Sequence, residues 1–335
     1  MAQRPLAAMP RRIPAAPAAR GRLVVTGDIT CLTRARPFAA RGKATPLWLR
    51  LPAAGDAAFP PAPLTLTLHT EDGPWEVPLR RLPVEFLRRP DQRAAMGEAV
   101  AQGPAALWEF CAHHPPTLHA ILHGFADAAW PRSSRAAPFF GAEAYALERD
   151  GRQLWCRLHL HPLPGDGEGE GEGEGERLDP RALFGALTPE APARWRLCVQ
   201  IMSEAEAREA PFDAFDATHL WPTVRWPLIE VGIIALEGRL DIAPRLAAQP
   251  ALPGIALAPR APRRPGAGEP PAGPFYRGLE GAERARLMDR LATALHGLPE
   301  ATTRRLLDLC TAADAELGAG LLRRLRPRPF LWAAE

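Results

Sequence analysis

The chain has 335 residues, of which 47% are hydrophobic, so it can bury a sizeable core and its composition excludes wholesale disorder. Its formal net charge is only +3, and the arginines are scattered along the chain, which gives no electrostatic basis for binding nucleic acid. No stretch approaches the roughly 18 apolar residues that a membrane span needs. We therefore expect a cytoplasmic protein with no membrane segment and no nucleic-acid partner.

The cysteines predict neither disulfides nor a zinc site. No CxxC pair occurs, and the number of cysteines is odd. We expect reduced, buried thiols, as in a cytosolic protein. The five are Cys31, Cys111, Cys156, Cys198 and Cys310.

Short apolar runs with a period of two residues recur along most of the chain and predict eight strands. The first four cover residues 21–27, 45–51, 64–70 and 82–88. Helical tracts are predicted next, over residues 92–110 and 117–125. The remaining strands cover residues 142–148, 153–159, 195–202 and 227–236. Eight strands are enough for a closed barrel. The interior of such a barrel can be filled by side chains or by one ligand.

Two segments without periodicity interrupt this pattern. Residues 165–176 alternate Gly and Glu; their carboxylates suit calcium, but such regular glycines favour a solvated, self-repelling loop. Residues 256–274 are rich in Pro, Gly and Arg and read as a linker. After it, leucines at helical spacing predict two amphipathic helices that pack back on the barrel. We thus divide the chain into an arm (1–20), a barrel domain (21–255), a linker (256–274) and a helical segment (275–335).

Several motifs are long, collinear and correctly spaced for one known family. Residues 195–232 read WRLCVQIMSEAEAREAPFDAFDATHLWPTVRWPLIEVG. This resembles the haem-catalase segment W-x-L-x-VQ-x-M, PF-x-x-FD-x-T-x-x-WP and PLIEVG. Residues 27–50 (GDIT to TPLWLR), 70–88 (TEDGPW) and 275–279 (FYRGL) resemble further catalase segments in the same order. The resemblance implies an α+β catalase fold, with an eight-stranded antiparallel β-barrel, a wrapping segment and C-terminal helices.

The resemblance also implies where catalase chemistry would sit, and most of those positions have changed. The segment expected to hold the distal histidine, residues 10–25, has none, and Arg81 stands where a distal amide is expected. The proximal tyrosine would fall in residues 260–274, which contain no tyrosine. The two tyrosines, Tyr145 and Tyr276, match a barrel aromatic and a later helix start. The family's imidazole base and phenolate ligand are therefore expected to be missing.

Two pocket positions survive in the resemblance. Arg50 matches an arginine that pairs with a haem propionate, and Phe86 matches an aromatic near the haem on its distal side. The alternatives are a strand-end salt bridge for Arg50 and ordinary barrel packing for Phe86. We name both as residual cofactor-binding positions, and we assign no catalytic residue and no metal ligand.

Other sites are weaker still. A nucleotide site that some catalases carry is matched at His119, whereas Ala128 and Thr223 stand in place of an arginine and a histidine. The pair His113 and His114 could suggest a metal, but neighbouring side chains on a helix point apart. No P-loop, GxGxxG after a strand or GxSxG occurs.

The sequence leaves three functions open. The first is a pseudoenzyme with no cofactor that binds an unidentified small ligand or protein partner. The second is a haem-dependent catalase or weak peroxidase that decomposes hydrogen peroxide through an unrecognised ligand. The third is a haem-free enzyme. Oligomerisation also stays open, because family catalases assemble through a longer N-terminal arm.

The position of Arg81 is expected to show whether the pseudoenzyme binds a small ligand or has a purely structural role. The family's turn geometry directs it to the distal pocket with Glu85 as a partner, whereas its charge favours the solvent side. An open, arginine-lined cavity would favour a small anionic ligand. A collapsed pocket with Arg81 in solvent would favour a purely structural role.

Overall fold

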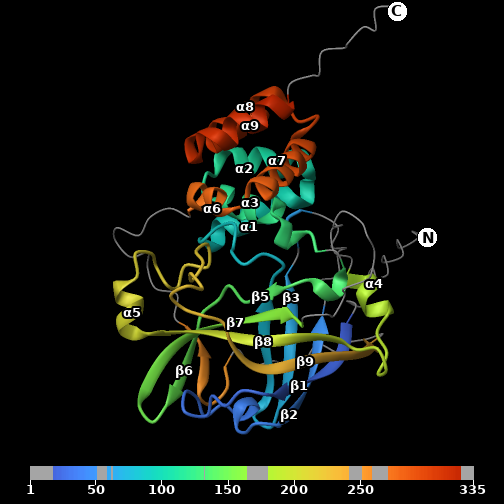
Figure 1. Ribbon diagram of the computed structural model, residues 1–335, viewed down its shortest axis with the longest axis vertical. Helices are drawn as coiled ribbons and strands as arrows, with labels where there is room; N and C mark the ends of the chain where they lie inside the picture. Colours follow the sequence, from blue (N-terminus) through green and yellow to red (C-terminus); the bar gives the residue numbers. More distant parts are fainter. Residues whose placement is uncertain are drawn as a thin grey trace, which may run out of the picture.

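The computed structural model describes residues 18–50, 59–61, 63–131, 133–163, 180–240, 251–258 and 271–325. The Gly/Glu tract, most of the predicted arm and most of the predicted linker lie outside these residues. The described part forms a curled β-sheet with a layer of helices beside it (Figure 1). Among the described residues, no helix is both long and apolar enough to span a membrane.

The strands form one antiparallel sheet in the order β10-β6-β7-β8-β9-β1-β2-β3-β4, with β5 also pairing with β7. Their bounds are β1 Ala18–Val25, β2 Ala44–Arg50, β3 Leu64–Thr70, β4 Gly73–Leu79, β5 Phe139–Phe140, β6 Tyr145–Arg149, β7 Arg152–Pro162, β8 Ala193–Ser203, β9 Ile229–Leu240 and β10 Ile255–Leu257. Arg80 and Phe140 exchange two backbone hydrogen bonds of 2.8 and 2.7 Å, which join the end of β4 to β5. The antiparallel β-structure predicted from the sequence is therefore confirmed, but the described residues form a curled sheet of ten strands rather than eight, because the sequence does not predict β4, β5 and β10.

One predicted strand is wrong and its neighbour was missed. Residues 82–88 form no strand; their apolar side chains instead pack into the cluster of the helical layer. The real strand is β4, whose Trp75, Val77 and Leu79 alternate inward. Pro74 and Pro78 interrupt the alternating apolar pattern of β4 in the sequence. A strand tolerates prolines, which have no N–H to donate, when it lies at the end of the strand order, as β4 does.

A glycine and a proline set the boundary between the first two helices. They are α1 Pro90–Gln102, α2 Pro104–His113, α3 Thr117–Phe125, α4 Pro180–Gly185, α5 Glu204–Glu209, α6 Ala272–Gly278, α7 Gly281–Leu295, α8 Glu300–Ala313 and α9 Ala315–Leu325. The tract predicted over 92–110 is two helices, because Gly103 has a φ of 114° and Pro104 follows it. The prediction of a helix over 117–125 is confirmed.

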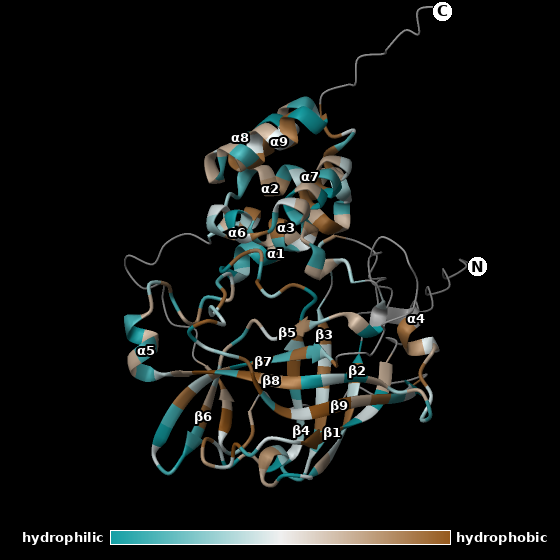
Figure 2. Cartoon of the chain, viewed as in Figure 1, coloured by the Kyte–Doolittle hydropathy of each residue, from teal (hydrophilic) through white to brown (hydrophobic). Residues whose placement is uncertain are grey.

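The C-terminal helices pack on other helices as well as lying beside the barrel. Where two were expected, α6 to α9 follow Pro271, and they contact α2 and α3. Together these elements bury one apolar cluster, while the sheet encloses a second one around Trp75, Tyr145 and Trp195. Figure 2 shows brown, apolar residues both on the strands of the sheet and on the helices. The tail helices therefore complete a helical layer rather than a barrel wall.

A buried arginine ties the 212–226 loop to the sheet. Arg157 on β7 is 1% exposed, and its guanidinium donates to the backbone oxygens of His219 (2.6 Å), Ala214 (3.2 Å) and Asp216 (3.2 Å). The guanidinium also lies 4.9 Å from the ring centroid of Trp221. The Ala214 oxygen also accepts from Nε1 of Trp221 and the Asp216 oxygen from the His219 N–H, so Arg157 adds a second donor to these two carbonyls and supplies the donor for the buried His219 oxygen.

Replacing this arginine should destabilise the fold strongly. We expect Arg157→Met to lower the free energy of unfolding by about 2–4 kcal/mol, because the loop loses three hydrogen bonds to the sheet and the buried His219 carbonyl loses its donor. Arg152→Met is the matched control, since Arg152 lies on the same strand and is exposed; it should change stability by about 0.5 kcal/mol or less. Urea unfolding of both variants measures the difference, and equal losses would contradict this role of Arg157.

Candidate functional site

Arg50 and Phe86 have different surroundings. Arg50, at the end of β2, places Nη2 2.9 Å from Oε1 of Glu76, so it forms a strand-end ion pair. Phe86 is 8% exposed and packs edge-on against Phe59, with ring centroids 5.5 Å apart. Phe86 lines a cavity of about 270 Å³ beside α1, and Arg50 is not among its lining residues.

Arg81 and Glu85 are both buried, so the expectation that they lie on the solvent side is wrong. Arg81 is 5% exposed, with its guanidinium carbon 5.7 Å from the ring centroid of Phe139. Glu85 forms an ion pair with Arg80. Arg80, Glu85 and Arg93 line the 270 Å³ cavity, whereas Arg81 is not among its lining residues. The geometry thus differs from both alternatives: Arg81 is neither in solvent nor on the wall of this cavity.

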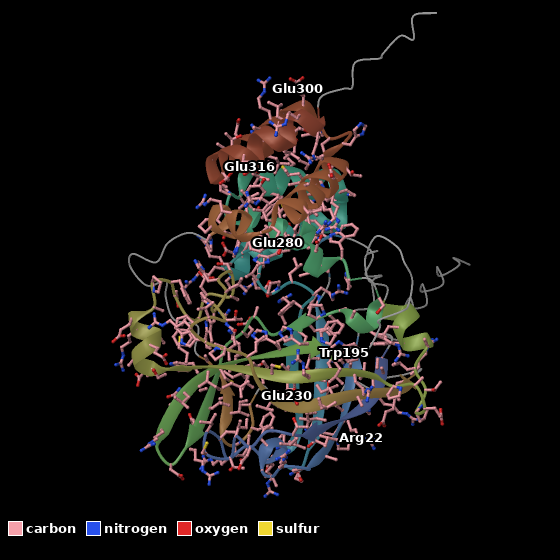
Figure 3. The ribbon with its side chains drawn as sticks, viewed as in Figure 1. Arg22, Trp195, Glu230, Glu280, Glu300 and Glu316 are labelled. Atoms are coloured by element: carbon pink, nitrogen blue, oxygen red, sulfur yellow. The ribbon has the colours of Figure 1, made fainter. Side chains whose placement is uncertain are left out.

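The two tyrosines are buried phenols in different layers. Tyr145 lies in the barrel core, edge-on to Trp75 at 5.7 Å, and burial raises the pKa of its phenol far above the ordinary value. Tyr276 on α6 donates a hydrogen bond to Sδ of Met288 (3.7 Å). Burial, with Glu316 nearby, raises the pKa of Tyr276 as well. In Figure 3, Glu316 marks this helical layer and Trp195 the barrel.

These surroundings do not fit a haem ligand. An axial tyrosine has to be deprotonated, and a phenolate needs a nearby cation or hydrogen-bond donors. Arg284 places its guanidinium carbon 5.5 Å from the ring centroid of Tyr276, but burial and Glu316 outweigh it, so the pKa values of both described phenols are raised and both stay protonated. The buried cysteines offer no substitute: burial raises the pKa of Cys111 and of Cys310 to about 12, and it raises the pKa values of Cys156 and Cys198 too. Contrary to our expectation, one thiol, Cys31, is exposed; the others are buried, and all five are free.

A second cavity, which we call the histidine cavity, lies between the sheet, the 212–226 loop and the helices α3 and α6. Its volume is about 420 Å³. Four histidines line it, together with aromatic rings from several elements, and none of its lining residues is Asp, Glu, Lys or Arg. The histidines are His119, His159, His161 and His219, and the aromatic residues are Phe140, Phe212, Trp221 and Phe275.

The hydrogen bonds of Gln200 determine which nitrogen of His159 carries the proton. The Gln200 side-chain N–H groups donate to the backbone oxygens of Trp221 (2.9 Å) and Trp226 (2.6 Å). Its Oε1 therefore accepts, and His159 Nε2, 3.2 Å away, must donate. Nδ1 of His159 is left as an acceptor, buried and with no hydrogen-bond partner in the described part of the chain.

Two further histidines, His119 and His123, join the helical layer to the 212–226 loop. Nδ1 of His119 lies 3.0 Å from the Thr218 oxygen and must donate to it, which leaves Nε2 of His119 as an acceptor. Nε2 of His123 lies 3.2 Å from that acceptor and donates to it. His123 in turn packs on Phe275, with ring centroids 3.8 Å apart. The loop, α3 and α6 are therefore held together at one wall of the cavity.

Burial keeps these imidazoles neutral. It lowers the pKa of His119 to about 4 and that of His159 to about 3, and it lowers the pKa values of His123 and His161. Nearby charge adds to the effect, because Arg157 is close to His159 and Arg196 is close to His161. At neutral pH these four imidazoles are thus uncharged; His219, the remaining histidine of the cavity wall, places Nδ1 3.7 Å from Oδ2 of Asp216.

Only part of the histidine cavity is matched by residues singled out in the sequence. His119 and Thr223, two positions compared with the family's nucleotide site, both line the cavity. His159, His161 and His219 were not predicted as site residues. A signal for two of them exists, because His159 and His161 are two residues apart on β7 and therefore lie on the same face of the strand. His113 and His114 each bond a carbonyl of their own helix at 2.8 Å. In the described residues, no group of three or more His, Cys, Asp or Glu side chains could hold a metal ion.

Comparisons with known proteins agree on one family. A family model described as Catalase matches residues 8–241. A catalase of the Onchocerca volvulus endobacterium is 31% identical over 240 residues, covering 65% of this chain and 50% of that protein. A Helicobacter pylori catalase is 28% identical over 267 residues, covering 72% and 53%. The chain thus spans about half the length of the curated relatives it matches.

Solved structures show the same fold. A bacterial catalase structure has a TM-score of 0.74 and 20% identity, covering 94% of this chain and 87% of that one. Catalase A from Saccharomyces cerevisiae has a TM-score of 0.76 and 17% identity, covering 95% and 90%. The catalase fold predicted from the motifs is confirmed.

The neutral histidines predict a loss of stability in mild acid. Their folded pKa values lie below the ordinary value of 6.5, so the unfolded chain binds more protons as the pH falls. Stability should fall from about pH 6.5 downward, with the His119 contribution, roughly 3 kcal/mol, fully lost near pH 4. Urea midpoints measured between pH 8 and pH 4 test this, and a midpoint that stays constant over that range would contradict it.

Proposed function

This chain belongs to the catalase family, and on that premise we propose that it is a haem-free pseudoenzyme that binds a small molecule in the histidine cavity. The observation that carries the proposal is the state of the tyrosines. Neither described phenol has the surroundings of a phenolate ligand, since Tyr145 is buried in the barrel core and Tyr276 is bonded to Met288.

The residues at the positions of the family's distal haem pocket support the same proposal. Catalase chemistry needs a group that removes a proton from one peroxide oxygen and returns it to the other. The first histidine of this chain is His69, on β3, after the segment where the family's distal histidine is expected. Arg81 stands at the position of the distal amide, and a guanidinium only donates hydrogen bonds. The described residues therefore supply no proton shuttle at the expected place.

The histidine cavity supports the binding half of the proposal. It is a concave site with apolar walls, a few convergent polar groups and titratable residues whose pKa values are perturbed. That combination is typical of ligand sites. Its volume of about 420 Å³ also falls within the usual range of roughly 300–1,000 Å³ for small-molecule pockets.

The alternative function is decomposition of hydrogen peroxide by a haem-dependent catalase or weak peroxidase. It is favoured by the family match over residues 8–241 and by relatives named catalase. It would require a ligand other than the two described phenols in their present surroundings.

Haem supply during expression separates the two functions. We expect the purified protein to show no Soret band near one equivalent of haem and no oxygen release from hydrogen peroxide. An authentic catalase expressed under the same conditions is the control. A stoichiometric Soret band with rapid oxygen release would overturn the proposal in favour of the alternative.

Should haem bind at all, Tyr276 is expected to take no part in holding it. Tyr276→Phe should then leave the absorption spectrum unchanged, because its hydroxyl is bonded to Met288. The melting temperature of the variant controls for folding. A lost or shifted Soret band in a folded Tyr276→Phe protein would show that this phenol is the ligand.

A further inference from the structure

We propose that a second cavity, separate from the histidine cavity, binds a small monocarboxylate with an apolar body. It is the cavity of about 270 Å³ beside α1, which we call the arginine cavity because Arg80 and Arg93 line it. This inference goes beyond the proposed function, since it concerns another cavity and another class of ligand. Two features of the described walls carry it: accessible guanidinium groups and an otherwise apolar lining.

Arg93, on α1, has hydrogen-bond donors left for a ligand. Its Nη1 donates to the backbone oxygens of Leu87 (3.2 Å) and Arg88 (3.0 Å), which fixes the side chain in place. In the described part of the chain its Nε and Nη2 have no partner, and neither is a buried atom, so both reach accessible space. The acid nearest to it along the chain, Asp91, is held by Arg89 at 2.6 Å. The N–H groups on Nε and Nη2 are therefore available to an acceptor in the cavity.

Arg80 adds a second cation, which Glu85 compensates only in part. Nε of Arg80 pairs with Glu85, while the Arg80 side chain is 27% exposed and its Nη nitrogens are not buried. Because guanidinium groups stay protonated in proteins, Arg80 and Arg93 bring two positive charges, against at most one negative charge from Glu85. None of the other described lining residues is charged. The described wall is thus positive whatever the protonation state of Glu85, and it favours an anion.

The rest of this wall is apolar and selects the kind of anion. Leu82, Val84, Phe86 and Met96 line the cavity and are at most 8% exposed, and Val100, at 37%, continues the apolar surface toward solvent. Such a wall gives inorganic phosphate nothing in exchange for its hydration, whereas it stabilises an apolar body by burial. The planar fork of a guanidinium also matches the two oxygens of a carboxylate. A volume just below the usual range of roughly 300–1,000 Å³ for ligand pockets requires a small molecule.

The experiment compares two probes of the same shape but different charge. Benzoate and benzamide are titrated into the purified protein at low ionic strength, and binding is measured by calorimetry. We expect saturable binding of benzoate and at least tenfold weaker binding of benzamide, because only the carboxylate forms charge-assisted bonds with arginine. Equal affinities would overturn the role of charge, and no binding of benzoate would overturn the ligand class. Inorganic phosphate that binds as tightly as benzoate would overturn the requirement for an apolar body.

A filled cavity provides the site control. Gly97 lines the cavity within α1, and a Cβ added there meets no atom within 4 Å. Gly97→Leu therefore occupies the cavity and also favours the helix. Ala95→Leu is the matched control, since Ala95 is exposed on the same helix and is not a lining residue. We expect the first variant to weaken benzoate binding at least tenfold and the second to leave it unchanged; equal affinities in the two variants would place the binding elsewhere.

Two further variants separate this cavity from the histidine cavity. In Arg93→Gln we expect the affinity for benzoate to fall at least tenfold while that for benzamide stays the same, because the charge is lost and the shape is kept. Undiminished benzoate binding in folded Arg93→Gln protein would overturn the proposal; if this variant does not fold, Gly97→Leu still decides. Thr223→Trp, which fills the histidine cavity from an exposed position, should leave benzoate binding unchanged. Loss of benzoate binding in a folded Thr223→Trp protein would overturn the assignment to the arginine cavity.

Discussion

The burial of Arg157 is the constraint on which the candidate site depends. A fully buried guanidinium is costly unless its donors are used, and here burial lowers the pKa of Arg157 to about 10 while its N–H groups satisfy three carbonyls of one loop. Those bonds fix the path of the 212–226 loop over β7. They therefore determine where Phe212, His219 and Trp221 stand relative to His159.

The same loop joins the two layers. From the helical side, His119 donates to the Thr218 oxygen, and Arg88 bonds Asp213 and Asp216. The Glu85 N–H donates to the oxygen of Ala217 at 2.8 Å. The histidine cavity thus lies where sheet, loop and helices meet, and its shape depends on all three. Ligand sites are common at such junctions because no single element has to be hollowed out.

The barrel interior shows why the family fold alone does not decide the function. Its core is closed by large side chains, including Trp75, Tyr145 and Trp195, which are at most 1% exposed. Arg81 packs against Phe139 rather than along the wall of the smaller cavity. A fold can be retained by packing while the groups that perform chemistry change, since packing depends on volume and chemistry depends on individual atoms.

The sequence by itself determined the family and most of the strands and helices, because long motifs and apolar periodicity are local properties. The sequence did not predict β4, because prolines in a strand are acceptable only where the strand lies at the end of the strand order. It wrongly predicted a strand over residues 82–88, whose apolar side chains pack on helices. Only the tertiary structure brought His119, on α3, beside His159 on β7 and His219 on the loop. It also decided the charge of His119 and His159, because a pKa depends on burial and on neighbours distant in the chain, and neither can be read from spacing.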